Sequence, residues 1–389
     1  MQYITDLKSG NKLSVLGFGC MRFPLDKTKT EQLIISAIEA GVNYFDTAYI
    51  YGTSEVTLGA ILEKNSLRDR IYIATKLPHS KCKSYEDFDR LLNEQLLRLK
   101  TEYIDYYLIH NIADLNMWKR LCDIGIEKWI EKKKSAGQIR CLGFSFHGTQ
   151  NGFMDLMDSY GWDFCQIQYN YMDENYQAGR AGLEKAREMG VPVIIMEPLL
   201  GGKLADGLPP KAERLFKEVD SSRSAACWAL SWLWDQIGVF VVLSGMNSIE
   251  QLEDNLKSAE MAKPGMLSEQ ETAVFKPVVA ALREAYKVPC TGCNYCMPCP
   301  QGVNIPGCFT AYNTSFVMGF VSGTTQYITG TGAHRTDKQY RAIYCTRCKA
   351  CETKCPQHIA ISREMQAVKK KMEPFWFNAA MRILRLFIS

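Results

Sequence analysis

Two short cysteine runs near the carboxyl end have the spacing of metal-cluster ligands. The first is Cys290-x-x-Cys293-x-x-Cys296-x-x-Cys299-Pro300, and the second is Cys345-x-x-Cys348-x-x-Cys351-x-x-x-Cys355-Pro356. A cysteine at every third position lets three thiolates bind one iron–sulfur cubane, while the fourth cysteine reaches a second cluster. Two such runs therefore predict two [4Fe–4S] clusters and an electron-transfer function.

The same crossing rule predicts which cysteines share a cluster. We assign the first cluster to Cys290, Cys293, Cys296 and Cys355, and the second to Cys345, Cys348, Cys351 and Cys299. The first run is one residue shorter before its last cysteine, so Cys299 departs most from the pattern. Zinc is the main alternative, but a zinc knuckle needs neither four cysteines in each run nor a proline after them.

The remaining cysteines show no ligand spacing, and we interpret them as ordinary core or surface thiols. They are Cys20, Cys82, Cys122, Cys141, Cys165, Cys227 and Cys308. A disulfide framework would suit a small secreted protein, whereas the first ten residues lack the apolar segment of a signal peptide. Free thiols and clusters together predict a reducing, cytoplasmic location.

A second group of chemically interesting residues follows short apolar runs in the first two thirds of the chain. Asp46, Lys76 and His110 each stand at the end of such a run, and Tyr51 follows Asp46 by five residues. Each residue by itself has an ordinary structural explanation. Four titratable types at the ends of consecutive strands, however, would meet at one edge of a parallel sheet and form a candidate active site.

The elements that would hold these residues alternate between strands and helices. Eight strands are expected at residues 16–21, 44–48, 71–76, 104–110, 140–145, 164–169, 193–196 and 240–244. This number and spacing predict a (β/α)8 TIM barrel, an α/β fold whose active sites lie at the carboxyl ends of the strands. An open doubly wound sheet is the alternative, but Gly17-Phe18-Gly19 is not its glycine-rich turn.

Helix-capping signals support the alternation. Thr30 opens an apolar-periodic run that stops at Gly41. Ser84 with Asp87 and Ser248 with Gln251 have the spacing of capping boxes. We therefore expect helices after the first, third and last of these strands.

These residues and motifs resemble the aldo-keto reductase superfamily, over about residues 14–257. The resemblance includes the Asp–Tyr–Lys–His tetrad of that superfamily at Asp46, Tyr51, Lys76 and His110, and the segments 143–145, 166–170, 197–202 and 244–248. The two cysteine runs resemble the iron–sulfur branch of the superfamily, which adds a C-terminal two-cluster ferredoxin-like domain.

The resemblance implies a role for each member of the tetrad. Tyr51 would give its proton to a carbonyl oxygen, although a phenol with a pKa near ~10 does so only with help at neutral pH. Lys76 would favour the phenolate, and Asp46 would keep Lys76 ionised. His110 would hydrogen-bond the substrate oxygen and set its angle to the hydride.

A nicotinamide cofactor, NADP(H) or NAD(H), is also implied by the resemblance. Ser145 and Gln166 would hold the nicotinamide amide, and the helix after Ser248 would offer N–H groups to phosphate. The other expected contacts are Met196, Pro198, Leu199, Gly201, Lys203, Gly245, Met246, Gln251 and Asn255. Residues 244–251 contain no Lys or Arg for a 2′-phosphate, so the preference for NADP(H) comes from the superfamily alone.

The length of 389 residues and the charge distribution predict two domains, 1–284 and 285–389. The second contains 13 Lys and Arg against 4 Asp and Glu, and the first holds the other 33 and 38. The excess of cations would neutralise the clusters or attract an acidic electron carrier of the ferredoxin or flavodoxin type. Nothing resembles the basic, aromatic stripe of a nucleic-acid-binding protein.

The second domain is expected to be mostly α-helical, with helices at residues 311–321 and 338–344. No apolar run is long enough for a transmembrane helix. An apolar segment with two arginines ends the chain and predicts a helix packed on the protein, with membrane-surface contact as the alternative. Its residues are Phe375, Trp376, Phe377, Met381, Arg382, Ile383, Leu384, Arg385, Leu386 and Phe387.

Together these features predict an NAD(P)-linked oxidoreductase that acts on a small carbonyl or alcohol substrate. The clusters would relay single electrons to or from a partner or the active-site pocket, whereas hydride carries two. The alternative is a nucleotide-binding, redox-sensing module in which the clusters are structural or regulatory.

Overall fold

The structure is a computed structural model that describes residues 1–335 and 338–388, with only the backbone of residues 383–388. Contacts divide the chain into two compact units. Unit 1 comprises Met1–Leu199 and Arg223–Thr272, and unit 2 comprises Leu200–Ser222 and Ala273–Ser389. The expected domain boundary between residues 284 and 285 falls at the end of a helix inside unit 2. That domain boundary remains a prediction.

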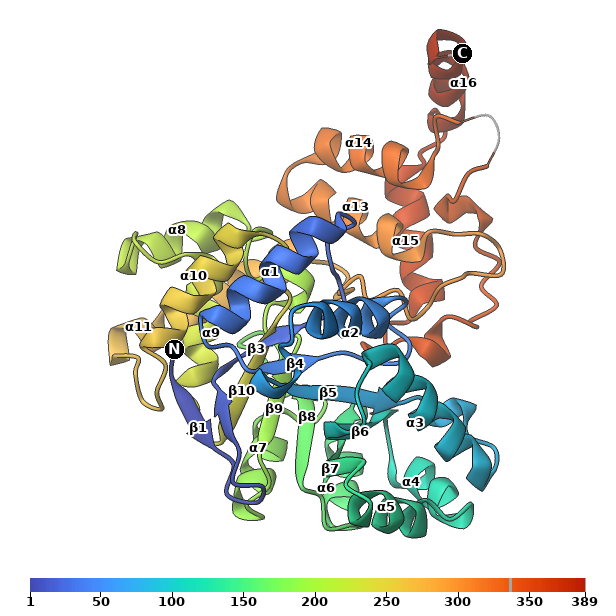
Figure 1. Cartoon of the computed structure of the whole chain (residues 1–389). Helices are drawn as coiled ribbons and strands as arrows, with labels where there is room; N and C mark the ends of the chain where they lie inside the picture. Colours follow the sequence, from blue (N-terminus) through green and yellow to red (C-terminus); the bar gives the residue numbers. More distant parts are fainter. Residues whose placement is uncertain (336–337, 389) are drawn as a thin grey trace. The chain divides into compact units, whose positions relative to one another are not determined.

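Unit 1 is built on a closed barrel of eight parallel strands, which confirms the predicted fold class (Figure 1). The strands follow one another in chain order around the barrel. They are β3 (Leu16–Gly19), β4 (Tyr44–Asp46), β5 (Tyr72–Leu77), β6 (Ile104–Ile112), β7 (Ile139–Phe146), β8 (Phe164–Gln168), β9 (Val193–Met196) and β10 (Val239–Ser244). Each strand overlaps its predicted range because these short apolar runs are buried on both faces.

Helices connect the strands of unit 1 and cover the outside of the barrel (Figure 1). They are α1 (Lys27–Glu39), α2 (Ser54–Lys64), α3 (Tyr85–Leu99), α4 (Leu115–Asp123), α5 (Ile126–Ser135), α6 (Gln150–Met157), α7 (Gly179–Glu188), α9 (Ala225–Trp234) and α10 (Ile249–Glu260). The short α11 (Glu269–Ala273) ends this part of the chain. Short 3-10 turns at Arg68–Arg70 and His79–Lys81 lie on either side of β5.

The capping predictions have three different outcomes. Ser84 and Asp87 form the complete capping box of α3, as predicted. Ser248 caps α10, but the side chain of Gln251 accepts a hydrogen bond from the N–H of Asn247 instead of completing the box. The predicted start of α1 at Thr30 is wrong, because the carboxylate of Asp26 caps the helix one turn earlier.

An N-terminal hairpin that the sequence did not reveal closes one end of the barrel. Strands β1 (Tyr3–Thr5) and β2 (Lys12–Ser14) pair antiparallel, and Leu13 joins the apolar cluster inside the barrel. The hydroxyl of Tyr106, near the start of β6, lies 3.3 Å from Oδ2 of the buried Asp6. Because Tyr106 lies near the amino end of its strand, the hairpin covers the end opposite the expected active site.

Unit 2 is mostly helical, and its core contains cysteines from both runs. Its helices are α8 (Pro210–Val219), α12 (Phe275–Ala285), α13 (Ile305–Val317), α14 (Phe320–Thr331), α15 (Ile361–Met372) and α16 (Phe377–Ile388). Short 3-10 turns occur at Leu200–Gly202, Ala342–Tyr344 and Glu352–Lys354. Helix α13 packs against both α14 and α15 (Figure 1).

Two helix predictions in unit 2 are wrong in detail. The expected helix at 311–321 is interrupted at Met318 and Gly319, and Gly319 has φ 89°. A single helix cannot pass through a residue in that conformation, so two helices form. Within the described part of 338–344, only Ala342–Tyr344 is helical, as a 3-10 turn.

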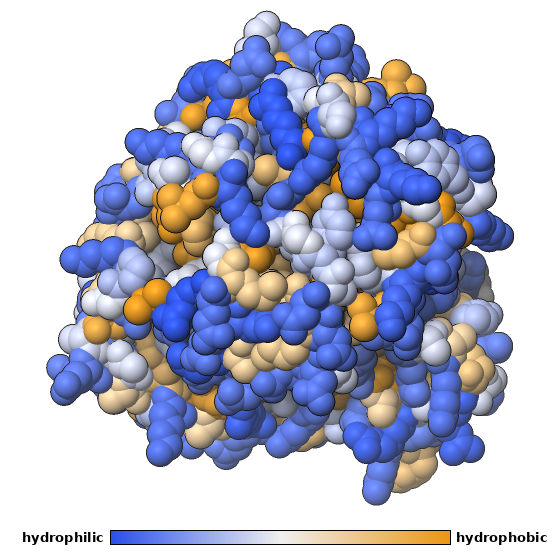
Figure 2. Space-filling view, turned by 90° about the horizontal axis from the view of Figure 1, so that it is seen from below, coloured by the Kyte–Doolittle hydropathy of each residue, from blue (hydrophilic) through white to orange (hydrophobic). Residues whose placement is uncertain are grey.

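The C-terminal segment forms α16, whose first turns pack into the core of unit 2. Phe377 is fully buried and Met381 is 5% exposed, whereas Phe375 is 97% exposed. The side chains of Ile383, Leu384, Arg385, Leu386 and Phe387 lie outside the described residues. None of the helices described is both long and apolar enough to cross a membrane. On the face seen in Figure 2, hydrophilic residues predominate and hydrophobic ones form small separate groups.

Candidate active site

Adjacent strands bring a buried lysine and a buried aspartate together at the carboxyl end of the barrel. Asp46 ends β4 and Lys76 lies in the neighbouring β5. The Lys76 ammonium donates to Oδ1 and Oδ2 of Asp46, at 2.8 and 2.7 Å, and to the carbonyl of Thr47 at 2.7 Å. Lys76 is 0% exposed and Asp46 is 4% exposed. Three acceptors therefore fix the ammonium in one position.

Tyr51 and His110 lie beside this ion pair. The Lys76 Nζ is 5.0 Å from the centroid of the Tyr51 ring. The imidazole of His110, from β6, meets the Tyr51 ring edge-on with their centroids 5.9 Å apart. The four residues selected from the sequence thus form one group, in which Tyr51 is half-buried and the other three are buried.

Burial and charge determine the protonation states in this group. Burial lowers the pKa of His110 well below its usual value, and the nearby Lys76, His147 and His79 lower it further. His110 is therefore a neutral imidazole at pH 7. Burial raises the pKa of Asp46 and lowers that of Lys76, and the attraction between the two opposes both shifts. The short contacts to both carboxylate oxygens favour the ionised pair.

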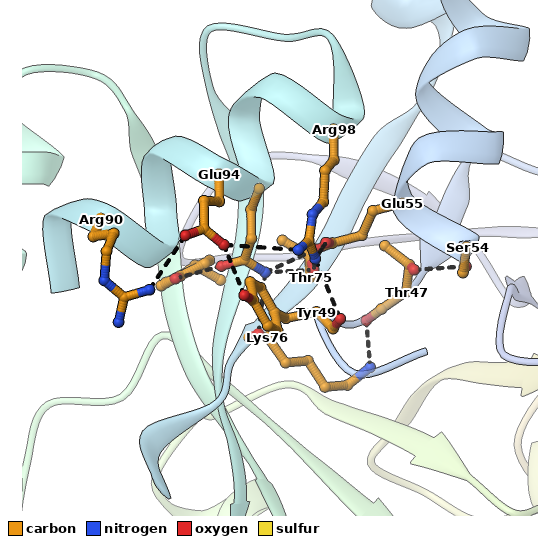
Figure 3. Close-up of polar contacts among 11 residues, drawn as sticks. Thr47, Tyr49, Ser54, Glu55, Thr75, Lys76, Arg90, Glu94 and Arg98 are labelled. Carbon is orange, nitrogen blue, oxygen red and sulfur yellow. Dashed lines mark hydrogen bonds and ion pairs between the residues drawn. The ribbon is translucent and has the colours of Figure 1, made fainter. Parts of the chain in front are cut away.

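A second buried carboxylate, which the sequence reasoning missed, supports Lys76 from outside the barrel (Figure 3). Glu55 is 1% exposed, and its Oε1 accepts from the Thr75 hydroxyl at 2.6 Å and from Gln95 Nε2 at 2.8 Å. Gln95 Nε2 also lies 3.1 Å from the carbonyl of Lys76. Arg98 donates to Glu55 Oε2 at 3.2 Å. The network holds the backbone of β5 at the residue that carries the ammonium.

The close packing of α2 on α3 makes this network possible. A β-carbon at Gly59 would lie only 2.4 Å from the carbonyl oxygen of Arg98, so a glycine is needed at that position. The resulting approach brings Glu55 on α2 to Gln95 and Arg98 on α3. The sequence did contain one sign that Glu55 is buried: it lies on the same face of an amphipathic helix as the apolar residues Leu58 and Leu62.

The start of α2 is tied to the same strand ends by hydroxyl groups. The Ser54 hydroxyl donates to the carbonyl of Cys20 at 2.7 Å and lies 2.7 Å from the Thr47 hydroxyl. All three residues are buried. Because Thr47 also offers its carbonyl to Lys76, these bonds fix the short loop that carries Tyr51.

The residues expected to hold the nicotinamide lie on β7, β8 and β9 of the same barrel. Ser145 Oγ accepts from the N–H of Asn111 at 2.8 Å, which leaves its hydroxyl proton available to a ligand. Gln166 Nε2 is 3.6 Å from the Met196 sulfur. The amide oxygen of Gln166 is buried and has no hydrogen-bond partner within the described residues. The Ser145 hydroxyl can donate to the carbonyl oxygen of a carboxamide, and the Gln166 amide oxygen can accept from its N–H group. The two side chains therefore fit the carboxamide of nicotinamide.

The segment at the start of α10 contains the other expected nucleotide contacts of unit 1. Gly245 is exposed, whereas Met246 and Asn255 are buried. Asn255 Nδ2 donates to the Ser244 hydroxyl at 2.8 Å, so it holds the end of β10 against α10. The exposed N-terminus of α10 is compatible with phosphate, and these contacts remain predictions.

The nucleotide contacts expected just after β9 are divided between the two units. Pro198 and Leu199 belong to unit 1, and Gly201 and Lys203 belong to unit 2. Gly201 has φ 67°, and a β-carbon there would lie 2.3 Å from the carbonyl oxygen of Thr291. Lys203 Nζ lies 3.4 Å from the carbonyl of Val288. Their contact with a nucleotide remains a prediction.

The four cysteines assigned to the first cluster line one pocket in unit 2. They are Cys290, Cys293, Cys296 and Cys355, and the apolar part of the lining includes Ile305, Phe309, Ile359 and Ile361. Burial raises the pKa of Cys296 to about 12, with further contributions from the other three thiols. Four thiols that line one largely apolar pocket fit the donor set and the environment of a [4Fe–4S] cluster.

Three of the cysteines assigned to the second cluster, Cys299, Cys345 and Cys351, are neighbours, and none of the four is buried. Burial, together with the nearby thiols of Cys299 and Cys345, raises the pKa of Cys351 to about 11. Cys348 is exposed. The donor set again fits a [4Fe–4S] cluster. Burial raises the pKa of the fully buried Cys308, and the charges of Glu373, Cys345 and Cys299 raise it further. The sequence did not indicate that Cys308 lies near Cys345 and Cys299.

Comparison with known families identifies both parts of the chain. The profile described as "Aldo/keto reductase family" matches residues 15–271. The chain belongs to the aldo/keto reductase family. A second profile, described as "4Fe-4S dicluster domain", matches residues 289–360 of this aldo/keto reductase. Both findings confirm the architecture predicted from the sequence.

Relatives of this aldo/keto reductase match about two thirds of the chain or slightly more. The "Uncharacterized oxidoreductase YqkF" of Bacillus subtilis is 28% identical over 67% of this chain and 90% of its own. The "6-dehydroglucose reductase" of Novosphingobium aromaticivorans is 25% identical over 65% and 88%. The structure of the aldo-keto reductase AKR11C1 from Bacillus halodurans covers 72% of this chain and 96% of its own, with 26% identity and a TM-score of 0.60. The chain is therefore an oxidoreductase of the aldo-keto reductase type.

Proposed function

We propose that this aldo/keto reductase transfers hydride between NADP(H) or NAD(H) and a small carbonyl or alcohol substrate at Tyr51. The observation that supports it most directly is the buried Lys76–Asp46 ion pair beside the rings of Tyr51 and His110. Ser145 and Gln166 would hold the nicotinamide amide, because the first offers a hydroxyl donor and the second a carbonyl acceptor. We favour NADP(H) over NAD(H) only because the aldo-keto reductase superfamily favours it.

The chain's own residues would carry out the proton transfer. When bound, the dihydronicotinamide supplies hydride to the carbonyl carbon. Tyr51 donates its phenolic proton to the developing alkoxide, and the Lys76 ammonium, 5.0 Å from the ring centroid, stabilises the phenolate that remains. Neutral His110 donates an N–H to the same substrate oxygen and orients it. In alcohol oxidation the proton moves in the opposite direction.

We further propose that the eight cysteines hold two [4Fe–4S] clusters that relay electrons to or from a partner. A cubane exchanges one electron at a time, so its partner would be a one-electron carrier of the ferredoxin or flavodoxin type. The excess of cations in residues 285–389 favours an acidic carrier. A cytoplasmic location, with its reducing conditions, would suit such clusters.

The variant Tyr51→Phe tests the hydride-transfer proposal. We expect single-turnover oxidation of NADPH or NADH by a panel of small carbonyls, 6-dehydroglucose included, to slow by about 10²–10⁴-fold. Nucleotide affinity should stay at the wild-type value, which shows that the site is intact. Normal turnover in this variant would remove Tyr51 from its role.

Cluster absorption tests the relay separately. Anaerobic protein is mixed with NADPH, with a candidate substrate, or with a low-potential one-electron donor. Bleaching of the cluster absorption supports a relay, and its absence with all three reagents rules the relay out.

A further inference from the structure

The two cysteine sites of unit 2 differ in their access to solvent. Cys296, in the first site, is 8% exposed and lies among apolar residues. In the second run, residues 346–350 are all exposed, including Cys348. Electron transfer between proteins requires a close approach to the cluster. Of the two sites, the second offers that approach through residues 343–354, here named the cluster-two loop.

The cluster-two loop is positively charged. Arg347, Lys349 and Lys354 are exposed, and none of them forms an ion pair within the described part of the chain. Glu352 is the loop's one acidic residue, and its carboxylate accepts from the N–H of Ser362 at 2.8 Å. That carboxylate is therefore turned toward the start of α15.

The positive charge of the loop is carried by exposed side chains. Residues 343–354 contain three Lys and Arg against one Glu. The three cationic side chains are exposed, whereas the Glu352 carboxylate is bonded to the start of α15, so a partner that approaches Cys348 meets positive charge. An excess of one sign at an exposed redox site attracts a partner of the opposite charge.

Two apolar side chains complete the surface next to Cys345. Ile343 is 37% exposed and Tyr344 is 42% exposed. Protein interfaces commonly combine such an apolar centre with a charged rim. Transient redox interfaces are among the smallest protein interfaces.

The base of the loop is rigidly held, so the surface is formed before a partner arrives. The buried Arg341 pairs with Glu373, whose Oε1 also accepts from the N–H of Ile343 at 3.0 Å. The N–H of Ala342 donates to the Tyr327 hydroxyl at 2.8 Å. These bonds anchor the residues just before Cys345 to α14 and to the end of α15, which reduces the entropy lost on docking.

We propose that the cluster-two loop is the docking surface for an acidic, one-electron carrier protein, and that the second cluster site exchanges electrons with it. This inference rests on the proposed relay function. It adds which surface the carrier contacts and which of the two cluster sites exchanges electrons with it. In each encounter the reduced carrier loses one electron and the oxidised cluster gains one, with no bond or proton change. Electron flow in the opposite direction uses the same contact.

Association kinetics with a small acidic flavodoxin test the proposal on the full-length, cluster-loaded protein. The loop variant is Arg347→Gln/Lys349→Gln/Lys354→Gln. The control variant, Lys119→Gln/Lys128→Gln/Lys132→Gln, removes the same charge from exposed positions of unit 1. We expect the loop variant to associate roughly 10–100-fold more slowly at low salt, with a weaker salt dependence, and the control to remain within about 2-fold of wild type.

Four additional measurements make the outcome unambiguous. Iron and sulfide content must match wild type, and Arg347→Lys, which keeps the charge, must associate normally. If the cations only neutralise the cluster, the loop variant changes the cluster potential but keeps the wild-type association rate, which overturns the proposal. Tyr51→Phe separates the docking proposal from the hydride-transfer proposal. This variant should bind flavodoxin like wild type whether or not hydride transfer depends on Tyr51.

Discussion

The ammonium of Lys76 contacts both carboxylate oxygens of Asp46, at 2.7 and 2.8 Å, inside the barrel where neither residue is more than 4% exposed. A charge buried this deeply is tolerated only when its partner is present. Asp46 therefore has two separable effects, one on stability and one on the chemistry that Lys76 supports.

Removing one partner of this pair should destabilise the barrel. We expect Asp46→Asn to lower the free energy of unfolding by about 3–5 kcal/mol, because the Lys76 charge remains buried without its counterion. The double variant Asp46→Leu/Lys76→Met should recover part of that loss but remain inactive. Thermal unfolding and hydride-transfer rates measured on the same samples check both statements. Equal stability of the single variant and wild type would contradict the buried ion pair.

Glu55 should matter for catalysis although it does not reach the substrate. In Glu55→Gln the bonds from Thr75 and Arg98 weaken, which should cost about 1–3 kcal/mol of stability. Displacement of the β5 backbone at Lys76 should slow hydride transfer by roughly 10-fold, with little change in KM.

Glu94→Gln is the matched control for that prediction. Glu94 pairs with the same Arg98 at 3.7 Å, but its side chain is 37% exposed. Its loss should change stability by about 0.5 kcal/mol or less and leave the rate unchanged. Equal effects of the two variants would show that burial of Glu55 has no special importance.

His110 should remain neutral well below the ordinary histidine range. Its depressed pKa means that its imidazole NMR signals, assigned by their absence in His110→Asn, show no titration midpoint near pH 6.5. Below that pH the unfolded chain binds a proton that the folded chain does not, so His110 makes stability decrease as the pH falls. A midpoint at or above 6.5 would contradict the burial argument.

Cluster content should distinguish Cys299 from its neighbour Cys308. The intact protein should contain about eight iron and eight sulfide ions, and Cys299→Ser should lose about half of them or hold the second cluster weakly. Cys308→Ser should retain the full content, because its thiol is directed to the carbonyl of Tyr340 at 3.9 Å. Loss of iron in Cys308→Ser with retention in Cys299→Ser would reverse the ligand assignment.

The sequence by itself determined the barrel and the positions of its chemical residues. Strand-length apolar runs are local features, and in a parallel barrel the residue that ends each run must lie at the same rim. For this reason Asp46, Lys76 and His110 could be selected before their contacts were known, and Tyr51 followed from its spacing. The cysteine runs were equally informative, since cubane ligation depends on local spacing and turn geometry.

Only the tertiary structure decided which additional polar groups are buried and what they contact. Glu55 and Gln95 are 40 residues apart, and their hydrogen bond exists because Gly59 lets α2 approach α3. The hairpin under Tyr106 and the thiol of Cys308 beside Cys299 and Cys345 likewise depend on segments that are distant in the chain. Local spacing encodes the periodicity of one element, whereas burial and partner choice depend on where remote elements pack.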